Sequence, residues 1–391
     1  MKNIVILSAA RTPVGSFLGK LSSLPAPALG SAAIRGALEK SGVAPSEVEQ
    51  VVFGNVLQAG QGQAPARQAS RGAGIPDEVP CVTVHKVCGS GMRAVMDVAN
   101  AIQAGEYELA VAGGMESMSN APYLLERART GYRMGNASLV DSLIKDGLWD
   151  PYGDVHMGNC AELCVSKYNF TREEQDAYSL ESYRRAQQAT TEGLFADEIV
   201  PVDVPQKKGP AERVEKDEEP FAAPLDKIKS LKPAFQKDGS VTAANSSKIN
   251  DGAAALVVAS EDRARARGFR PIARILAYTG VAQAPEWFTT APIGAIRKLL
   301  EKTGVKLSDI DLFEINEAFA AVALAAIREL DLDPAKVNVR GGAVAMGHPI
   351  GASRARILTT LVHALRREGK KRGIAAICIG GGEATAMLVE V

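Results

Sequence analysis

Short apolar runs alternate with amphipathic segments along most of this chain. Runs such as VVFGNV (51–56) and IAAICIG (374–380) have the length and composition of buried strands. The stretch 82–105 begins as such a run, and from residue 89 onward it repeats apolar residues at helical spacing until Gly105. This alternation predicts an α/β protein in which helices cover sheets.

The α/β pattern occurs twice. Residues 38–49 (LEKSGVAPSEVE) and 300–311 (LEKTGVKLSDID) share six identities and four conservative exchanges at a constant offset of 262. Each copy has a helix closed by glycine, a short apolar strand, a second helix and a second strand. Two glycine-rich strand ends, VAGGMES (111–117) and ICIGGGEA (377–384), also correspond. We therefore expect two duplicated α/β halves packed together.

A segment of different character separates the two copies. Residues 201–232 are charged and interrupted by proline, whereas 171–193 reads as a helix with a capping box formed by Thr171 and Glu174. Long inserts of this kind are usually functional. We expect an inserted loop domain at 119–248, an N-terminal half formed by 1–118 plus 249–268, and a C-terminal half at 269–391.

Composition narrows the classes of function. Lys plus Arg equals Asp plus Glu at 45 each, so the protein has no overall field to attract nucleic acid or an anionic membrane. The apolar N-terminal stretch is too short for a signal peptide, and no run of 18 apolar residues occurs. We expect a cytoplasmic protein whose cysteines stay reduced, because they form no CxxC pair. The five cysteines are Cys81, Cys88, Cys160, Cys164 and Cys378.

Cys88 is the first candidate for chemistry. It stands between a strand and a helix and is followed by Gly-Ser-Gly. Unpaired N–H groups and the positive end of a helix favour a thiolate, so we expect a lowered pKa and a nucleophile there. The alternative is an inert buried cysteine. The two glycines favour the nucleophile, because they let a substrate approach closely.

Two other interpretations of the same residues remain. Gly89 to Ala94 also fits the dinucleotide fingerprint G-x-G-x-x-A, although that motif belongs at the first βα turn of its domain. Cys88, Cys378 and His348 could instead bind a metal, but they lack the close ligand pairs that zinc sites use. We expect neither a metal nor another cofactor.

The second half contributes two further candidates. His348 lies in the glycine-rich stretch 341–357 rather than on an apolar helix face, whereas His363 lies within a helix pattern and is interpreted as structural. Cys378 ends an apolar run just before Gly380, and N–H groups of such a glycine run can bind an oxyanion. Two cysteines and a histidine favour a covalent acyl mechanism.

Taken together, KVCGSGMRA, NEAFA (316–320), GHPIGASRAR and CIGGGEA resemble the thiolase family in identity, order and spacing over essentially the whole chain. The resemblance implies the layered αβαβα thiolase fold. It implies that Cys88 is acylated, that His348 activates it and that Cys378 moves the α-proton of a second thioester. Asn316, through a water, and His348 would form one oxyanion hole, and the N–H groups of Cys88 and Gly380 the other.

The short-chain branch of the family looks most similar, which implies reversible Claisen condensation of two acetyl-CoA to acetoacetyl-CoA and CoA by acetyl transfer. A longer-chain 3-ketoacyl-CoA thiolase and a non-catalytic acyl-lipid carrier of the same fold are the alternatives. The resemblance also implies a homotetramer, a dimer of dimers tethered by 119–145. The implied substrate-binding residues are Leu148, His156, Met157, Phe235, Ala243, Ser247, Phe288, Ala318 and Phe319.

Several positions depart from the familiar pattern without removing a catalytic group. Phe288 replaces an expected methionine, which changes the depth of the pocket. Pro220 and Lys227 lie near the expected contacts with the nucleotide end of coenzyme A. Charged residues stand where small or neutral ones are familiar at Lys248, Arg340 and Arg354.

Overall fold

A central sheet of ten strands organises the computed structural model, which describes residues 2–391. The main order is β14 (Leu312–Ile315), β15 (Arg372–Ile379), β16 (Glu383–Glu390), β13 (Ala273–Ala282), β1 (Ile4–Arg11), β12 (Asn250–Ser260), β5 (Leu109–Ser117), β3 (Gln50–Gly54) and β4 (Cys81–Val84). A short tenth strand, β2 (Gly15–Ser16), pairs with β12. β3 is parallel to both β4 and β5, and β14 is parallel to β15, whereas the other pairs are antiparallel.

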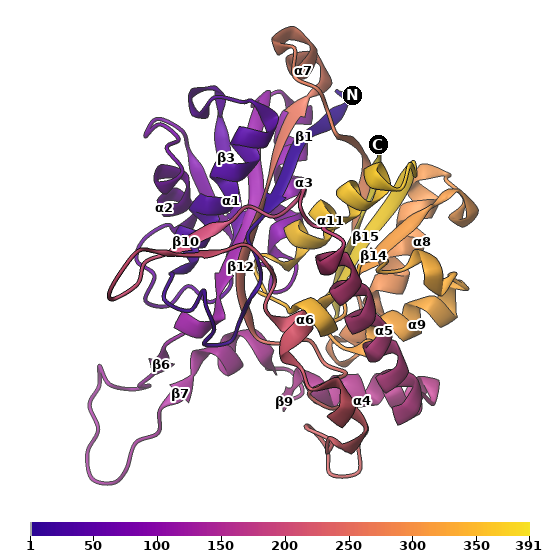
Figure 1. Cartoon of the computed structure of the whole chain (residues 1–391). Coiled ribbons are helices and arrows are strands. Elements are labelled where there is room, and N and C mark those ends of the chain that lie inside the picture. Colours follow the sequence, from indigo (N-terminus) through magenta and orange to yellow (C-terminus); the bar gives the residue numbers. More distant parts are fainter. Residues whose placement is uncertain (1) are drawn as a thin grey trace.

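The two halves of the sheet belong to the two sequence copies. Figure 1 shows the N-terminal copy, indigo to magenta, on one side of the molecule and the C-terminal copy, orange to yellow, on the other. They join where β1 pairs with β13, through Ile4 opposite Ile275 and Ile6 opposite Ala273. The sequence pattern predicts two α/β halves but gives no sign of this shared edge.

The helices of the two copies occupy matching places. α1 (Ala26–Ser41) packs on β1, β5 and β12, and α8 (Ala291–Thr303) packs on β13, β15 and β16. Both helices end at a glycine in the left-handed conformation, Gly42 and Gly304, as the repeat predicts. α3 (Ser90–Ala104) and α11 (Ser353–Arg367) pack against each other between the two halves of the sheet. The layers therefore run αβαβα.

The contact between α3 and α11 requires small residues. A Cβ atom on Gly91 would lie 2.9 Å from the backbone nitrogen of Ala355. A Cβ on Gly114 of β5 would lie only 2.0 Å from the carbonyl oxygen of Gly351, just before α11. Real Cβ atoms do not approach backbone this closely, so glycine allows the central helices to meet the sheet.

The insert contributes to the cores of both halves. Its helix α5 (Arg172–Thr191) begins with the predicted capping box, in which Glu174 N donates to the Thr171 hydroxyl at 3.1 Å. α4 (Met157–Tyr168) and α5 pack on α9 (Ala320–Leu330) of the C-terminal half. The hairpin of β10 (Val202–Val204) and β11 (Glu212–Val214) buries its valines in the core of the N-terminal half. The insert thereby ties the two halves together.

Shorter elements complete the chain. The pair β6 (Tyr123–Leu124) and β7 (Val140–Asp141) forms the base of an arm that extends from the body in Figure 1. Within residues 2–391, no helix is both long and apolar enough to cross a membrane. The remaining elements are α2 (Pro65–Gly72), α6 (Glu219–Ala222), α7 (Glu261–Arg267), α10 (Ala343–Met346), β8 (Trp149–Asp150), β9 (Val155–His156), a π-helical turn at Leu143–Leu148, and short 3₁₀ helices at Pro45–Glu47, Met118–Asn120, Leu225–Ser230, Pro285–Thr290, Leu307–Asp309 and Pro334–Lys336.

Gly114→Ala is expected to destabilise the protein by about 3 kcal/mol, because the new methyl group would overlap the Gly351 carbonyl and force the central layers apart. Urea unfolding measures the change. Gly294→Ala in α8 is the matched control, since its Cβ would meet nothing closer than Val281 Cγ2 at 3.8 Å. The control variant is expected to gain about 0.5–1 kcal/mol from helix propensity. Equal stability of the two variants would contradict the close packing described above.

Candidate active site

The turn that carries Cys88 has a strained backbone and is held in place by hydrogen bonds. Val87, just before it, has φ 45°, a left-handed conformation that a β-branched residue adopts only at a cost. Ser90 holds the turn, because its hydroxyl accepts from Lys86 N at 2.9 Å and donates to Val87 O at 2.7 Å. Cys88 is thereby fixed just before α3, as the sequence predicts, with Gly89 between it and the helix.

The expected low pKa of Cys88 is wrong for the free protein. Burial raises the pKa of this thiol to about 11, and this effect exceeds the opposing influence of Arg354 and of the N–H groups of Gly380 and Cys88 that hydrogen-bond the sulfur. Sequence reasoning identified the helix end but could not measure desolvation. A resting Cys88 is therefore a neutral thiol, and a base must remove its proton before it can attack.

His348 is suited to be that base. Its Nδ1 lies 2.5 Å from the Ser353 hydroxyl, and that hydroxyl donates its single hydrogen to Pro349 O at 2.8 Å. The hydroxyl must then accept from Nδ1–H, which leaves the lone pair on Nε2. Nε2 is buried and has no hydrogen-bond partner within residues 2–391. Burial, with Arg356 and Arg354, lowers the pKa of His348 to about 3, so the ring is neutral.

Three buried side chains hold the backbone of the His348 loop. Asn250 Oδ1 accepts from His348 N at 2.9 Å. Glu317 accepts from Val344 N at 3.0 Å on one side, and Glu116 accepts from Gly351 N at 2.9 Å on the other. Each comes from a different strand end, so the loop is fixed relative to both halves of the sheet. Sequence reasoning identified none of these three contacts, although Glu317 lies in the NEAFA motif and Glu116 lies in VAGGMES.

The second thiol lies deeper than the first. Cys378 lies one residue before the end of β15 and is 0% exposed, and burial together with the neighbouring Cys88 raises its pKa far above the ordinary range. Gly381 and Gly382, with φ 86° and 82°, form the turn into β16 and leave Gly380 facing Cys88. The predicted pairing of two thiols with a glycine N–H group is therefore present.

Asn316 is the last of the residues predicted to take part in catalysis. It follows β14 and its backbone N–H donates to Ala376 O at 3.0 Å. Its side chain is fully buried, yet neither its oxygen nor its nitrogen has a hydrogen-bond partner within residues 2–391. Buried amides are normally satisfied, so an unpaired one indicates a group that serves a ligand or a water. This observation is consistent with the predicted oxyanion hole.

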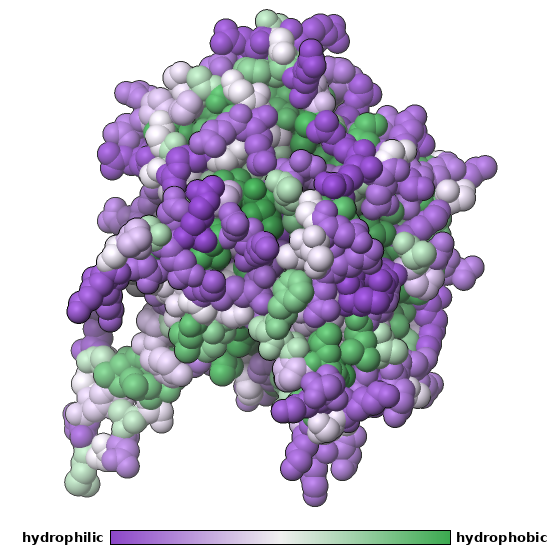
Figure 2. Space-filling view, in the orientation of Figure 1, coloured by the Kyte–Doolittle hydropathy of each residue, from purple (hydrophilic) through white to green (hydrophobic). Residues whose placement is uncertain are grey.

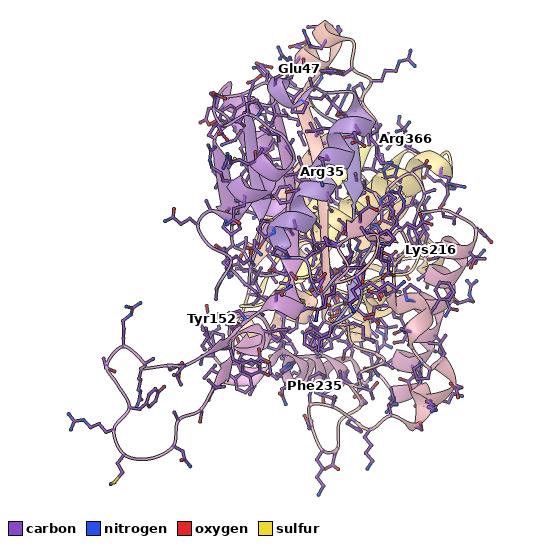
Figure 3. The ribbon with its side chains drawn as sticks, turned by 60° about the vertical axis from the view of Figure 1, so that its left-hand side comes forward. Arg35, Glu47, Tyr152, Lys216, Phe235 and Arg366 are labelled. Atoms are coloured by element: carbon purple, nitrogen blue, oxygen red, sulfur yellow. The ribbon has the colours of Figure 1, made fainter. Side chains whose placement is uncertain are left out.

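A pocket of about 410 Å³ opens onto Cys88, His348 and Gly380. All nine residues predicted to bind substrate line it. His156 stacks on Phe235 with ring centres 4.7 Å apart, and Phe319 stands edge-on to Phe235 and Phe288 at 6.0 and 6.3 Å. Phe235 lies in the lower part of the molecule in Figure 3, at the end opposite Glu47. Asn316 and Cys378 do not line the pocket in the described chain.

Sequence reasoning missed several residues that line the pocket. Phe17, Met118 and Ile350 add apolar wall. Phe17 and Met118 lie in none of the motifs quoted above, and Ile350 lies within GHPIGASRAR without having been singled out. Lys248 was noted only as a departure, but its ammonium donates to Ala243 O at 2.6 Å and Ser246 O at 3.1 Å. Burial lowers the pKa of Lys248 to about 8. It closes the loop that carries the predicted Ala243 and Ser247.

The rival interpretations are not supported by the geometry. Gly91, the second glycine of the dinucleotide-like motif, faces Ala355 of α11 rather than an open groove, so a pyrophosphate has no room there. No cluster of three or more His, Cys, Asp or Glu side chains among residues 2–391 is arranged to hold a metal ion. His363 is structural, as predicted, since its Nε2 lies 2.9 Å from Ala9 O.

Known proteins match this chain over its whole length. Residues 4–262 match the N-terminal domain of thiolase and residues 269–391 match its C-terminal domain. Acetyl-CoA acetyltransferase 2 of Arabidopsis thaliana is 52% identical, over 100% of this chain and 97% of its own. The acetyl-CoA acetyltransferase of Pseudomonas aeruginosa is 51% identical, over 99% of both chains. A crystal structure of an Ascaris suum thiolase in complex with coenzyme A is 48% identical, with a TM-score of 0.95 and complete coverage of both chains.

Glu116→Gln is expected to destabilise the protein by about 1–3 kcal/mol. Each carboxylate oxygen accepts two hydrogen bonds, Oε1 from Asn55 Nδ2 and Leu57 N, Oε2 from Val56 N and Gly351 N. An amide nitrogen cannot accept, so two of these bonds are lost in either orientation of the glutamine.

Urea unfolding of Glu116→Gln beside Glu106→Gln measures this effect. Glu106 is exposed, so the same exchange there is expected to change the free energy of unfolding by less than about 0.5 kcal/mol. A Glu116→Gln protein as stable as the Glu106→Gln protein would show that the carboxylate does not hold the loop.

Proposed function

The chain belongs to the thiolase family, and on this basis we propose that it is an acetyl-CoA C-acetyltransferase, an acyltransferase that condenses two acetyl-CoA into acetoacetyl-CoA and CoA, reversibly. The observation that carries the proposal is the meeting of Cys88, His348 and the Gly380 N–H group in one apolar pocket. These groups are the ones that a covalent acyl transfer needs.

Acetyl transfer begins at Cys88. His348 Nε2 takes the thiol proton, and the sulfur attacks the thioester carbonyl carbon. The developing oxyanion lies against donors already fixed by the fold, which is where such donors are most effective. The carbon–sulfur bond to CoA then breaks, and CoA leaves with a proton from Cys378. Acetyl-Cys88, a His348 imidazolium and a Cys378 thiolate remain.

Carbon–carbon bond formation uses the second thiol. The Cys378 thiolate takes the α-proton of an incoming acetyl-CoA, and the resulting carbanion attacks the acetyl carbon on Cys88. The carbon–sulfur bond to Cys88 breaks, and the thiolate regains its proton from His348. Each thiol thus ends as it began. Since the first product leaves before the second substrate reacts, the kinetics are ping-pong. No cofactor takes part in this scheme, and CoA thioesters are its substrates.

The aromatic wall supports a short acyl group. Phe288 and Phe319 are buried and line the pocket, and Met157 lies next to Gly380 in the same wall. Longer 3-ketoacyl chains would need space that these rings occupy. A non-catalytic carrier of the same fold would not need the hydrogen-bonded loops that hold His348 and Cys88. We place the reaction in the cytoplasm, because a free thiol at Cys88 is preserved in a reducing compartment.

A homotetramer is the proposed assembly. The arm between β6 and β7 exposes apolar side chains, with Leu139 at 65% and Tyr123 at 64% exposed. Figure 2 shows apolar residues on this arm, away from the body of the molecule. Apolar surface on an extended arm favours contact with another copy of the chain. We infer that part of 119–145 joins two dimers.

Acetyl-CoA is expected to acetylate Cys88, because this thiol faces the pocket and meets the lone pair of His348. Mass spectrometry of peptides from acid-quenched protein locates the label. Cys88→Ser is expected to keep its melting temperature and lose almost all turnover, since a hydroxyl is far harder to ionise. A label on Cys378 in the unmodified protein would show that the nucleophile is misassigned.

Cys378→Gly is expected to separate the two half-reactions. Exchange of acetyl between acetyl-CoA and free CoA should remain measurable, because Cys88 and His348 are intact. Condensation should fall by a factor of about 10³, since no group takes the α-proton. His348→Ala is the comparison variant and should damage both reactions. Loss of acetyl labelling in Cys378→Gly as complete as in Cys88→Ser would contradict this division.

Light scattering is expected to give a particle four times the 41.2 kDa chain. Replacing exposed Tyr123 and Leu139 together by Ser should give smaller particles, because apolar contact area is lost. Exchange of exposed Lys237 by Ser, outside the arm, is the control and should leave the mass unchanged. A single-chain mass for the unmodified protein would rule out the tetramer.

A further inference from the structure

Arg354 occupies an unusual place behind the two thiols. It is the second residue of α11, and its side chain is 0% exposed. One guanidinium nitrogen, Nη2, donates to Ile377 O at 2.5 Å, next to Cys378 on β15. The other, Nη1, donates to the Thr385 hydroxyl on β16 and lies 3.1 Å from the point where a Cβ on Gly89 would stand. The guanidinium therefore lies between the residue before Cys378 and the residue after Cys88.

This buried cation has no carboxylate partner among residues 2–391. Both of its hydrogen-bond acceptors are neutral, and its Nε is buried without a partner in the described chain. Glu383 is the carboxylate that acts on it, but Lys86 forms an ion pair with Glu383. The N-termini of α3 and α11 add further positive potential nearby. A buried charge normally requires compensation, so the position is unfavourable unless a negative charge forms beside it.

The titratable groups around the thiols identify where that negative charge can form. Glu116 on β5 acts on Cys88, but four donors already satisfy its carboxylate. Cys164 on α4 acts on Cys378 from within the same apolar core but is not among the groups that act on Arg354, and His348 cannot become an anion. Cys88 and Cys378 remain, and both act on Arg354.

The coupling between these groups is reciprocal. Burial lowers the pKa of the Arg354 guanidinium to about 9, and ionisation of either thiol would raise it again. By the same interaction, Arg354 lowers the pKa of both thiols against the effect of their own burial. A single fixed charge thus favours a thiolate at either sulfur.

We propose that Arg354 is a positioning residue for charge, whose buried guanidinium stabilises the one thiolate that forms first at Cys88 and then at Cys378. Arg354 forms no bond to substrate and moves no proton. Its guanidinium remains a cation while the proton passes between sulfur and His348. This role in turnover rests on the proposed acetyl transfer, whereas its effect on the Cys88 thiol can be measured without any substrate.

The rate at which iodoacetamide alkylates Cys88, followed from pH 6 to 10 with the site mapped by mass spectrometry, tests the proposal. Because the pKa of Cys88 is about 11, the alkylation rate in this range follows the small fraction of thiolate. In Arg354→Met, which keeps the bulk without the charge, a rise of about one unit in that pKa should make alkylation about tenfold slower at pH 8. Arg354→Lys, which restores a cation, should stay within about threefold of the unmodified protein.

Thr385→Val is the matched control. It removes one hydrogen bond of Arg354 and keeps the charge, so the pH profile of alkylation should not move. A purely structural role for Arg354 predicts the opposite pattern, in which Thr385→Val and Arg354→Lys disturb the site as much as Arg354→Met. That pattern, or an unshifted profile in Arg354→Met, would overturn the proposal.

Turnover gives an independent measurement. Arg354→Met should lower kcat for acetyl exchange and for condensation by about tenfold or more, with KM for acetyl-CoA unchanged, because Arg354 lies behind the pocket wall. Arg354→Lys should recover most of both rates. If the alkylation profiles shift as expected but Cys88 never carries acetyl, the proposed function fails and the charge effect stands. A changed KM with unchanged kcat would assign Arg354 to substrate binding instead and overturn its role here.

A second pair of variants covers the case in which Arg354→Met does not fold. Cys88→Asp places a carboxyl group near the guanidinium, which can ionise beside it at pH 8, and Cys88→Asn is its neutral match. At pH 8 the Asp protein should melt at a higher temperature than the Asn protein, because it supplies the missing counter-charge. An Asp protein that melts at the same or a lower temperature would overturn the proposal.

Discussion

The close contact of α3 and α11 between the two halves of the sheet is the constraint on which this structure depends. α11 is buried along nearly its whole length and α3 is buried on the face toward it, so the atoms at their N-termini cannot shift without moving the halves of the molecule. Gly91 and Gly114 make the contact possible, since any larger residue would meet backbone. Cys88 precedes one helix and His348 precedes the other. The packing of two interior helices therefore sets the distance between nucleophile and base.

The loops at these helix ends are held by buried acceptors rather than by packing alone. Glu116, Asn250 and Glu317 each accept from the backbone around His348, and they come from three separate strand ends. The Cys88 turn is held differently, through Ser90 and the strained Val87. In both cases hydrogen bonds fix the backbone of the loop, and the fixed backbone in turn places the reactive side chain. This arrangement keeps reacting atoms in place without occupying the pocket.

Burial decides the resting charge of the site. It keeps Cys88 as a thiol and His348 as a neutral ring, because each is less stable as an ion away from water. The neutral pair of Cys88 and His348 reacts slowly with oxidants and alkylating agents, since the thiolate is the reactive form of cysteine. The groups that counter this burial are fixed in the fold: the backbone N–H donors of Cys88 and Gly380, and the charged guanidinium of Arg354. These groups lower the pKa of the Cys88 thiol, but by less than burial raises it.

Local information in the sequence determined the elements and the reactive residues. The repeat predicted two α/β halves with helices ending at Gly42 and Gly304, Thr171 and Glu174 predicted the start of α5, and the motifs named residues that do line one pocket. These features depend on neighbours within a few positions, which a sequence displays directly. The joining of the sheets at β1 and β13, the carboxylates that hold the His348 loop, and the upward shift of the Cys88 pKa could not be predicted. They arise because segments far apart in the chain are buried together, and only the tertiary structure decides which groups lose water and which partners they meet.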